Sequence, residues 1–278
     1  MDYKIIVDSC CDMTPELAER FGVTSVPMML MLGSKEFVDD ETLDLPDFMV
    51  QMKDCKEKVS TAAPSPFSFM EAISAAINSF VVTISSQLSA SYANARMGRD
   101  FAEENGDTPN VHIFDTKSAS AGEVLVAIKL RELLTNGLPK DQIIQYINQF
   151  IDNMKTYFVL EKHDNLIKNG RLNKITGAIV QLLNVKLIMG ADGKGTITLF
   201  SKPLGTEQML ERMISLIRNS KKTTSGENLV ICHCNNLPLA KQLSDLVKRH
   251  FNFKEILIVP TRGAISLYAD DKGIVMAF

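Results

Sequence analysis

The chain of 278 residues contains no tryptophan, only four histidines and no continuous apolar run of the roughly 18 residues that a membrane-spanning helix needs. Its formal net charge is −3, so it lacks the excess of positive charge that is typical of nucleic-acid-binding proteins. These absences argue against a membrane-spanning protein and against nucleic acid as a partner. Transient contact with a membrane surface stays open.

A secretory signal and a disulfide framework are also missing. Residues 1–4 lead directly into a short apolar run, without the basic and then apolar segments of a signal peptide. The five cysteines are odd in number and scattered, which predicts reduced thiols. Both features favour a cytoplasmic location.

Motifs for metals, nucleotides and covalent catalysis are incomplete. Cys232-His233-Cys234 has no second cluster to complete the four ligands of a structural zinc ion. The segment 193–196 lacks the full phosphate-loop pattern and fits a hairpin turn better. No serine has the G-x-S-x-G surroundings of a hydrolase nucleophile. We therefore expect no metal, no cofactor and no catalytic residue.

Strand, turn and helix alternate through the first half of the chain. Apolar runs at 4–7, 80–84 and 111–115 are typical of buried parallel strands, and a helical pattern follows each. Residues 23–32 predict one further strand, broken or at an edge because of Pro27. The prolines within 59–66 predict a fixed, non-helical loop. This alternation predicts a doubly wound parallel sheet with helices on both faces.

The pattern changes after a helix predicted for 139–154. Residues 185–189 and 196–200 flank a glycine-containing hairpin signal, and further strands alternate with helices up to a last apolar strand at 274–278. A short apolar helix is predicted for 175–183. The fold class is therefore α/β with two domains: residues 1–155 as an N-terminal parallel α/β domain, and residues 156–278 as a C-terminal α/β domain with a mixed sheet.

A cluster of hydroxyl groups lies between the strand at 80–84 and the helix that follows it. Residues 85–92 read Ser-Ser-Gln-Leu-Ser-Ala-Ser-Tyr, with no acidic side chain. The free N–H groups and the dipole at a helix start attract anions, so this turn is a candidate anion site. The alternative is that Ser89 serves only as the N-cap of the helix.

Five segments, in this order, resemble the DegV family of bacterial fatty-acid-binding proteins along essentially the whole chain. They are Asp8-Ser9-Cys10-Cys11-Asp12 (D-S-x-x-D in the family), Thr61-Ala62-Ala63-Pro64-Ser65-Pro66 (T-S-Q-P-S-P), residues 85–92 (S-S-x-L-S-G-T-Y), residues 115–122 (D-S-x-x-x-S-x-G) and Asn169-Gly170-Arg171-Leu172 (G-G-R-I). The order and spacing of the five make the resemblance specific.

The resemblance implies that a long acyl chain is buried between or within the two domains. The hydroxyls of Thr61 and Ser89, with the backbone N–H of Ala90, would bind its carboxylate, and Arg171 would lie near this head group. The family's G-T-H-x-G-P-G segment differs here, because Arg262 stands where its histidine is expected. We expect Arg262 to pair with the carboxylate or to face a partner.

The resemblance also implies a carrier and not an enzyme, because a separate kinase would phosphorylate the bound carboxylate. About 14 methylenes would contribute on the order of 11 kcal/mol on burial, against about 1.5–3 kcal/mol for each charge-assisted hydrogen bond. Affinity would thus come from an apolar tunnel, and orientation from Thr61 and Ser89. Two alternatives stay open: a serine-dependent lipid or ester hydrolase that uses Ser89, and a binder of another small amphipathic anion.

Overall fold

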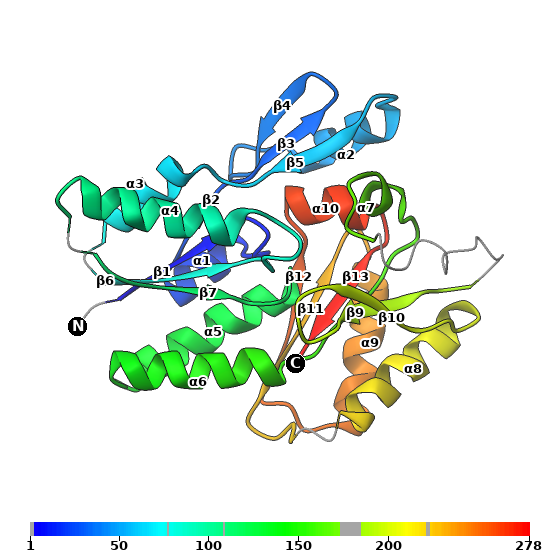
Figure 1. Cartoon of the computed structure of the whole chain (residues 1–278). Helices are drawn as coiled ribbons and strands as arrows, with labels where there is room; N and C mark the ends of the chain where they lie inside the picture. The colour runs from blue at the N-terminus through cyan, green and yellow to red at the C-terminus, as the bar shows by residue number, and fades with distance from the viewer. Residues whose placement is uncertain (1–2, 77, 108, 173–184, 221–222) are drawn as a thin grey trace.

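The computed structural model describes residues 3–76, 78–107, 109–172, 185–220 and 223–278 (Figure 1). Strands within these ranges form three sheets, of four, six and three strands. No helix in this part of the chain has both the length and the apolar character needed to cross a membrane.

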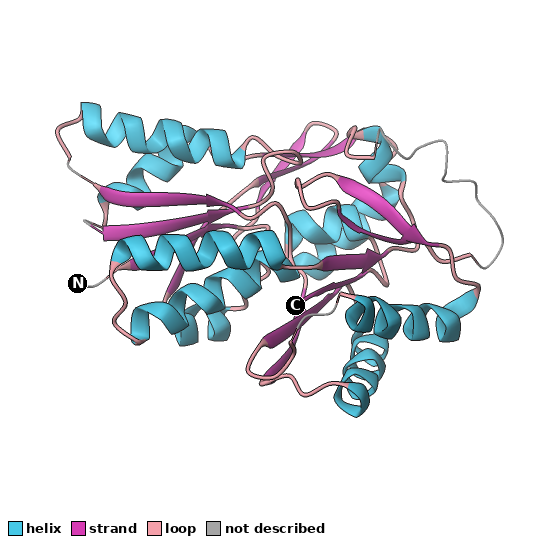
Figure 2. Ribbon diagram, turned by 60° about the horizontal axis from the view of Figure 1, so that its bottom comes forward, coloured by secondary structure: helices cyan, strands magenta, loops and turns pink. Residues whose placement is uncertain are grey.

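The four-stranded sheet carries the doubly wound half of the fold. Its order is β2-β1-β6-β7 and every neighbouring pair is parallel, as the sequence predicts. Helices α3 and α4 cover one face, and α5 and α6 cover the other (Figures 1 and 2). The elements are β1 (Lys4–Asp8), α1 (Pro15–Phe21), β2 (Val23–Val26), α3 (Pro66–Ser74), β6 (Asn78–Thr83), α4 (Ser91–Glu104), β7 (Asn110–Asp115), α5 (Ala121–Thr135) and α6 (Lys140–Asn153).

A three-stranded antiparallel sheet in this half was not predicted. It has the order β4-β3-β5, from β3 (Met29–Leu32), β4 (Lys35–Val38) and β5 (Val59–Ala62), and α2 (Leu45–Asp54) packs on it. The break predicted at Pro27 within 23–32 is confirmed: β2 ends before Pro27 at the edge of one sheet, and β3 begins after it in another sheet, which was not predicted. The loop predicted over 59–66 is wrong in its first four residues, which pair with β3 as β5.

The six-stranded sheet confirms the mixed sheet predicted for the second half. Its order is β10-β9-β8-β13-β11-β12, with β11 and β12 parallel and the other neighbours antiparallel. Its elements and flanking helices are β8 (Thr156–Val159), α7 (Asp164–Lys168), β9 (Ile188–Ala191), β10 (Ile197–Ser201), α8 (Gly205–Asn219), β11 (Asn228–His233), α9 (Leu237–His250), β12 (Glu255–Pro260), α10 (Gly263–Ala269) and β13 (Ile274–Ala277). The helix predicted for 175–183 lies outside the described residues.

Helix α5 packs between the two larger sheets. Its buried Val124, Leu125 and Ile128 belong to one apolar cluster that contains Phe80 of β6 and Val275 of β13. The three-stranded sheet in turn contacts α10, which belongs to the second half of the chain. The division at residue 155 remains a prediction, with α5 and the three-stranded sheet as the surfaces through which the two halves meet.

Helix α4 crosses α3 closely, and Gly98 is the point of contact. A Cβ atom at Gly98 would lie 2.6 Å from the carbonyl oxygen of Pro66, 2.8 Å from Cβ of Phe69 and 2.9 Å from the backbone nitrogen of Met70. Two of these three neighbours are backbone atoms, which cannot move away without shifting α3.

We predict that Gly98→Ala lowers the free energy of unfolding by about 1–3 kcal/mol, the usual range for overpacking, although alanine favours a helix over glycine by about 1 kcal/mol. Urea unfolding followed by circular dichroism measures the change. Ala93→Ser on the exposed side of α4 is the control and should leave the midpoint nearly unchanged. A Gly98→Ala variant as stable as the wild type would show that α3 and α4 can move apart at little cost in free energy.

Candidate head-group site

A cavity lies where strands of the six-stranded and three-stranded sheets meet the loops that follow β1, β6 and β7. Apolar side chains form most of its wall, among them Met28, Ile84, Phe158, Leu160, Ile197 and Val275. The cavity is open to solvent at one side, and the space inside it together with that opening is about 850 Å³. Thr61, Ser89 and Arg171 also line it, so three of the five residues predicted for the head group come together here.

The serine turn is held by its own backbone. The carbonyl oxygen of Ser85 accepts the N–H groups of Leu88 and Ser89, at 2.9 and 3.1 Å. The hydroxyl of Ser89 accepts the N–H of Ser91 at 3.2 Å, so its own proton is available for a ligand. Ala90 is exposed at the N-cap position of α4, without a side-chain cap. The turn thus places a hydroxyl and a helix start together.

Arg171 is tied to the same turn. Its Nε donates to the carbonyl oxygen of Leu88 at 3.0 Å, and Nη1 donates to the carbonyl oxygen of Asn169. These bonds fix the guanidinium beside Ser89, at the wall of the cavity. A positive charge held there suits a carboxylate ligand.

Thr61 comes from β5, where it pairs with Leu30 of β3. Its Oγ1 lies 3.0 Å from the phenol oxygen of Tyr268, which is on α10 and also lines the cavity. Sequence reasoning missed Tyr268, because residues 263–269 carried no recognised pattern and α10 was not predicted.

Arg262 is not among the described residues that line the cavity, which speaks against the first of its two predicted roles, pairing with the carboxylate, whereas contact with a partner stays a prediction. Its Nη1 and Nη2 donate to the carbonyl oxygens of Met13 and Asp39, at 3.3 and 3.4 Å, and its backbone N–H donates to Asp12 at 2.6 Å. Arg262 precedes α10 in an extended conformation, so its side chain follows the loop after β1. It connects the two halves of the chain instead of facing a ligand.

Two buried aspartates, Asp8 at the end of β1 and Asp39 after β4, hold the backbone around the site by accepting hydrogen bonds. Asp8 accepts the N–H groups of Cys10 and Ile84, at 3.1 and 3.0 Å, and the hydroxyl of Ser91. Asp39 accepts the N–H groups of Gly263 and Ala264, both at 2.9 Å, which caps α10. The motif that begins with Asp8 therefore has a structural role at the serine turn.

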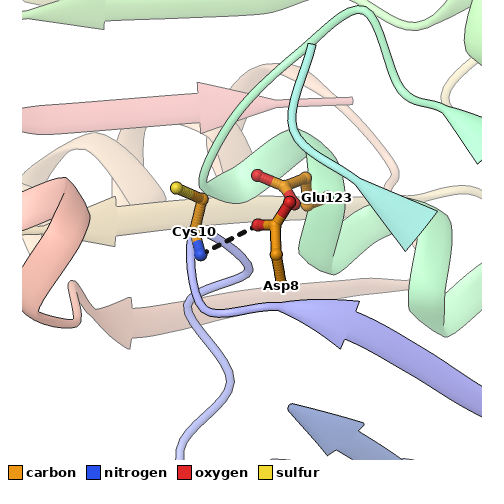
Figure 3. A group of neighbouring side chains, drawn as sticks. All are labelled: Asp8, Cys10 and Glu123. Carbon is orange, nitrogen blue, oxygen red and sulfur yellow. Dashed lines mark hydrogen bonds between the residues drawn. The ribbon is translucent and has the colours of Figure 1, made fainter. Parts of the chain in front are cut away.

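Glu123 of α5 lies against Asp8, and both are fully buried (Figure 3). Their oxygens and the Cys10 sulfur lie within 4.8 Å of one another, a grouping that could hold a metal ion. Among the described residues no group donates a hydrogen bond to either oxygen of Glu123. Burial and the charge of Asp8 raise the pKa of Glu123 well above its ordinary value. We therefore predict that Glu123 keeps its proton in the folded protein and shares it with Asp8.

Asp12 is a second buried acid with an altered pKa. It accepts the hydroxyl of Ser120 and the N–H of Arg262. Burial outweighs these hydrogen bonds and raises its pKa to about 7. Ser120 itself has a φ of 57°, unusual for a residue with a side chain, and starts α5. The buried acids thus join β1, α5 and the loop before α10.

The chain is similar to known proteins over nearly its whole length. A family model described as an uncharacterised protein of the DegV family matches residues 2–277. A DegV domain-containing protein of Streptococcus gordonii is 36% identical over 280 residues, which cover 100% of this chain and 99% of the other.

Two solved structures are similar over nearly the full length. A DegV family protein from Ruminococcus gnavus ATCC 29149, refined with vaccenic acid, has a TM-score of 0.95 and 34% identity, with 99% of both chains covered. The Streptococcus pneumoniae Fatty Acid Kinase (Fak) B3 protein, loaded with linoleic acid, has a TM-score of 0.91 and 32% identity, covering 100% of this chain and 99% of the other.

The shared proton predicts a pH-dependent stability. The unfolded chain releases the Glu123 proton above about pH 4.3, whereas the folded protein keeps it, so this contribution is full at lower pH and is lost as the pH rises toward the raised pKa. In the wild type, the unfolding free energy should fall as the pH rises. Glu123→Gln keeps a donor to Asp8 but has no proton to lose, so this fall should be smaller by up to about 1.4 kcal/mol per pH unit. Urea unfolding between pH 5 and 9 measures these slopes.

Glu19→Gln, at an exposed position of α1, is the matched control and should keep the wild-type slope. Equal slopes for Glu123→Gln and the wild type would show that Glu123 is ionised in the folded protein, and the shared proton would have to be abandoned.

Proposed function

The chain belongs to the DegV family, and from this premise we propose that it binds a long-chain fatty acid. The acyl chain occupies the apolar cavity. The carboxylate accepts hydrogen bonds from the hydroxyls of Thr61 and Ser89 and from the N–H of Ala90, with Arg171 beside it.

The observation that carries this proposal is an apolar cavity with a few polar groups gathered at one place on its wall. Thr61 touches Tyr268, and Arg171 is bonded to the residue before Ser89. Burial of methylenes contributes about 0.8 kcal/mol each, so a long chain gains most of its affinity from the cavity. The polar groups decide which end of the ligand lies where.

The proteins of similar structure add support. The relatives from R. gnavus and S. pneumoniae are described with vaccenic acid and linoleic acid, both long-chain fatty acids. Their similarity to this chain, 34% and 32% identity over nearly the whole length, favours a ligand of the same class.

We further propose that the protein is a carrier for a separate kinase and works in the cytoplasm without a cofactor. The Fak B3 relative is described as part of a fatty acid kinase, which supports a kinase as partner. Among the described residues that line the cavity there is no histidine to act as a base for Ser89. The reduced cysteines predicted from the sequence favour the compartment.

The first experiment is mass spectrometry of the lipids extracted from the purified protein. We expect a free fatty acid at close to one molecule per chain, because the apolar wall would otherwise be exposed to water. A protein that carries no fatty acid, and takes up none when it is added, would contradict the proposal and point to a smaller amphipathic anion.

The head-group assignment predicts a loss of discrimination between an acid and its ester. Thr61→Val and Ser89→Ala should each weaken binding of a fatty acid by roughly tenfold or more, the value of a charge-assisted hydrogen bond, and should leave its methyl ester little affected. Displacement of a fluorescent fatty acid gives both dissociation constants.

Two arginines provide a matched pair for this test. Arg171→Ala should reduce the preference for the acid over the ester by about tenfold, because it removes the charge beside the carboxylate. Arg262→Ala removes the same charge at a position outside the cavity, so the preference should stay as in the wild type. A reduced preference in Arg262→Ala, together with an unchanged preference in Arg171→Ala, would instead identify Arg262 as the head-group residue.

A further inference from the structure

Tyr268 is the polar side chain of α10 that reaches the cavity. Its phenol oxygen lies 3.0 Å from Oγ1 of Thr61, across 207 positions of sequence. The side chain is half-buried, and Arg171 is close enough to influence its charge state. None of the sequence motifs includes it.

The Thr61 hydroxyl has a single proton, which limits how it can contact Tyr268 and a ligand at the same time. A threonine hydroxyl has one proton and can accept through its lone pairs, as can a phenol. A carboxylate only accepts, so Thr61 must direct its single proton at the ligand. Thr61 can do so while still bonded to Tyr268 only if the phenol donates to Thr61. The direction of the bond between them is therefore determined by the ligand.

The phenol is suited to that task. Burial raises the pKa of Tyr268 above its ordinary value, so the group keeps its proton at any physiological pH. Its helix is also held firmly: Asp39 caps the start of α10, and the side-chain amide of Asn165 donates to the carbonyl oxygen of Leu267 at 2.8 Å. The donor is thus fixed in place before a ligand binds.

We propose that Tyr268 is a positioning residue for the carboxylate, which donates to Thr61 and thereby aims the Thr61 proton at the ligand. This inference rests on the proposed fatty-acid binding. A relay of this kind, from Tyr268 to Thr61 to carboxylate, strengthens both bonds because the Thr61 hydroxyl accepts one hydrogen bond while it donates the other.

The test is a double-mutant cycle on the delipidated protein, with cis-parinaric acid and its methyl ester as fluorescent ligands. Tyr268→Phe keeps the ring and removes the donor, and Thr61→Val keeps the shape and removes the hydroxyl. Tyr157→Phe, another buried tyrosine, on β8 and outside the lining of the cavity, is the control.

We expect Tyr268→Phe to raise the dissociation constant of the acid about three- to tenfold, as for a lost neutral hydrogen bond, and that of the ester less than twofold. Tyr157→Phe should match the wild type for both ligands. The double variant Thr61→Val with Tyr268→Phe should bind the acid no more weakly than Thr61→Val alone, because the phenol acts only through Thr61.

Three results would overturn the inference while leaving fatty-acid binding intact. The first is an unchanged affinity of Tyr268→Phe for the acid. The second is an equal loss of affinity for acid and ester in Tyr268→Phe, which would indicate that the phenol acts through packing. The third is a double variant whose fold-loss of acid affinity is the product of the two single fold-losses, which would indicate a direct contact between Tyr268 and the carboxylate. A wild-type protein that binds neither ligand would instead remove the proposed function, and the inference with it.

Discussion

The fully buried carboxylate of Asp8 is the constraint on which the rest of the site depends. A charge taken out of water must have its hydrogen bonds supplied by the protein. Asp8 obtains them from the N–H groups of Cys10 and Ile84 and from the hydroxyl of Ser91. These donors belong to the ends of β1 and β6 and to the start of α4, so a single side chain sets the relative position of all three. The turn that carries Ser89 lies between the last two and has little freedom left.

Equivalent bonds join the two halves of the chain around the cavity. Asp12 and Asp39 accept backbone N–H groups at the start of α10, and the Ser85 hydroxyl donates to the carbonyl oxygen of Gly195 at 2.8 Å, which attaches the β9–β10 hairpin to the serine turn. At Gly195 a Cβ atom would lie 2.2 Å from that hydroxyl, so only glycine permits the contact. The polar groups of the head-group site come from elements far apart in sequence, and these bonds bring them together.

The features that were predictable from the sequence are those encoded by neighbouring residues. The parallel strands, the mixed sheet, the serine turn and the surroundings of Arg171 all follow from periodicity or from a contiguous motif. Strand β5 was missed because two prolines close behind it dominate a short segment of small residues. Tyr268 and the displacement of Arg262 were missed for a different reason: each is defined by a partner more than 200 positions away, at Thr61 and at Asp39. Local pattern contains no information on such pairs.

The shared proton between Asp8 and Glu123 also bears on the anion that the site would hold. The Asp8 carboxylate accepts the hydroxyl of Ser91 at the start of α4, where the helix dipole favours a negative ligand. A second ionised carboxylate at this depth would oppose that ligand strongly, because charges interact over longer distances where water is excluded. With the predicted proton on Glu123, the buried pair carries at most one negative charge, and Ser91, Ile84 and Cys10 donate hydrogen bonds to Asp8. The dipole of α4 and the positive charge of Arg171 would then attract an anionic head group. The same acid pair that holds the serine turn in place therefore adds at most one negative charge beside it, which the dipole of α4 and the cation of Arg171 oppose.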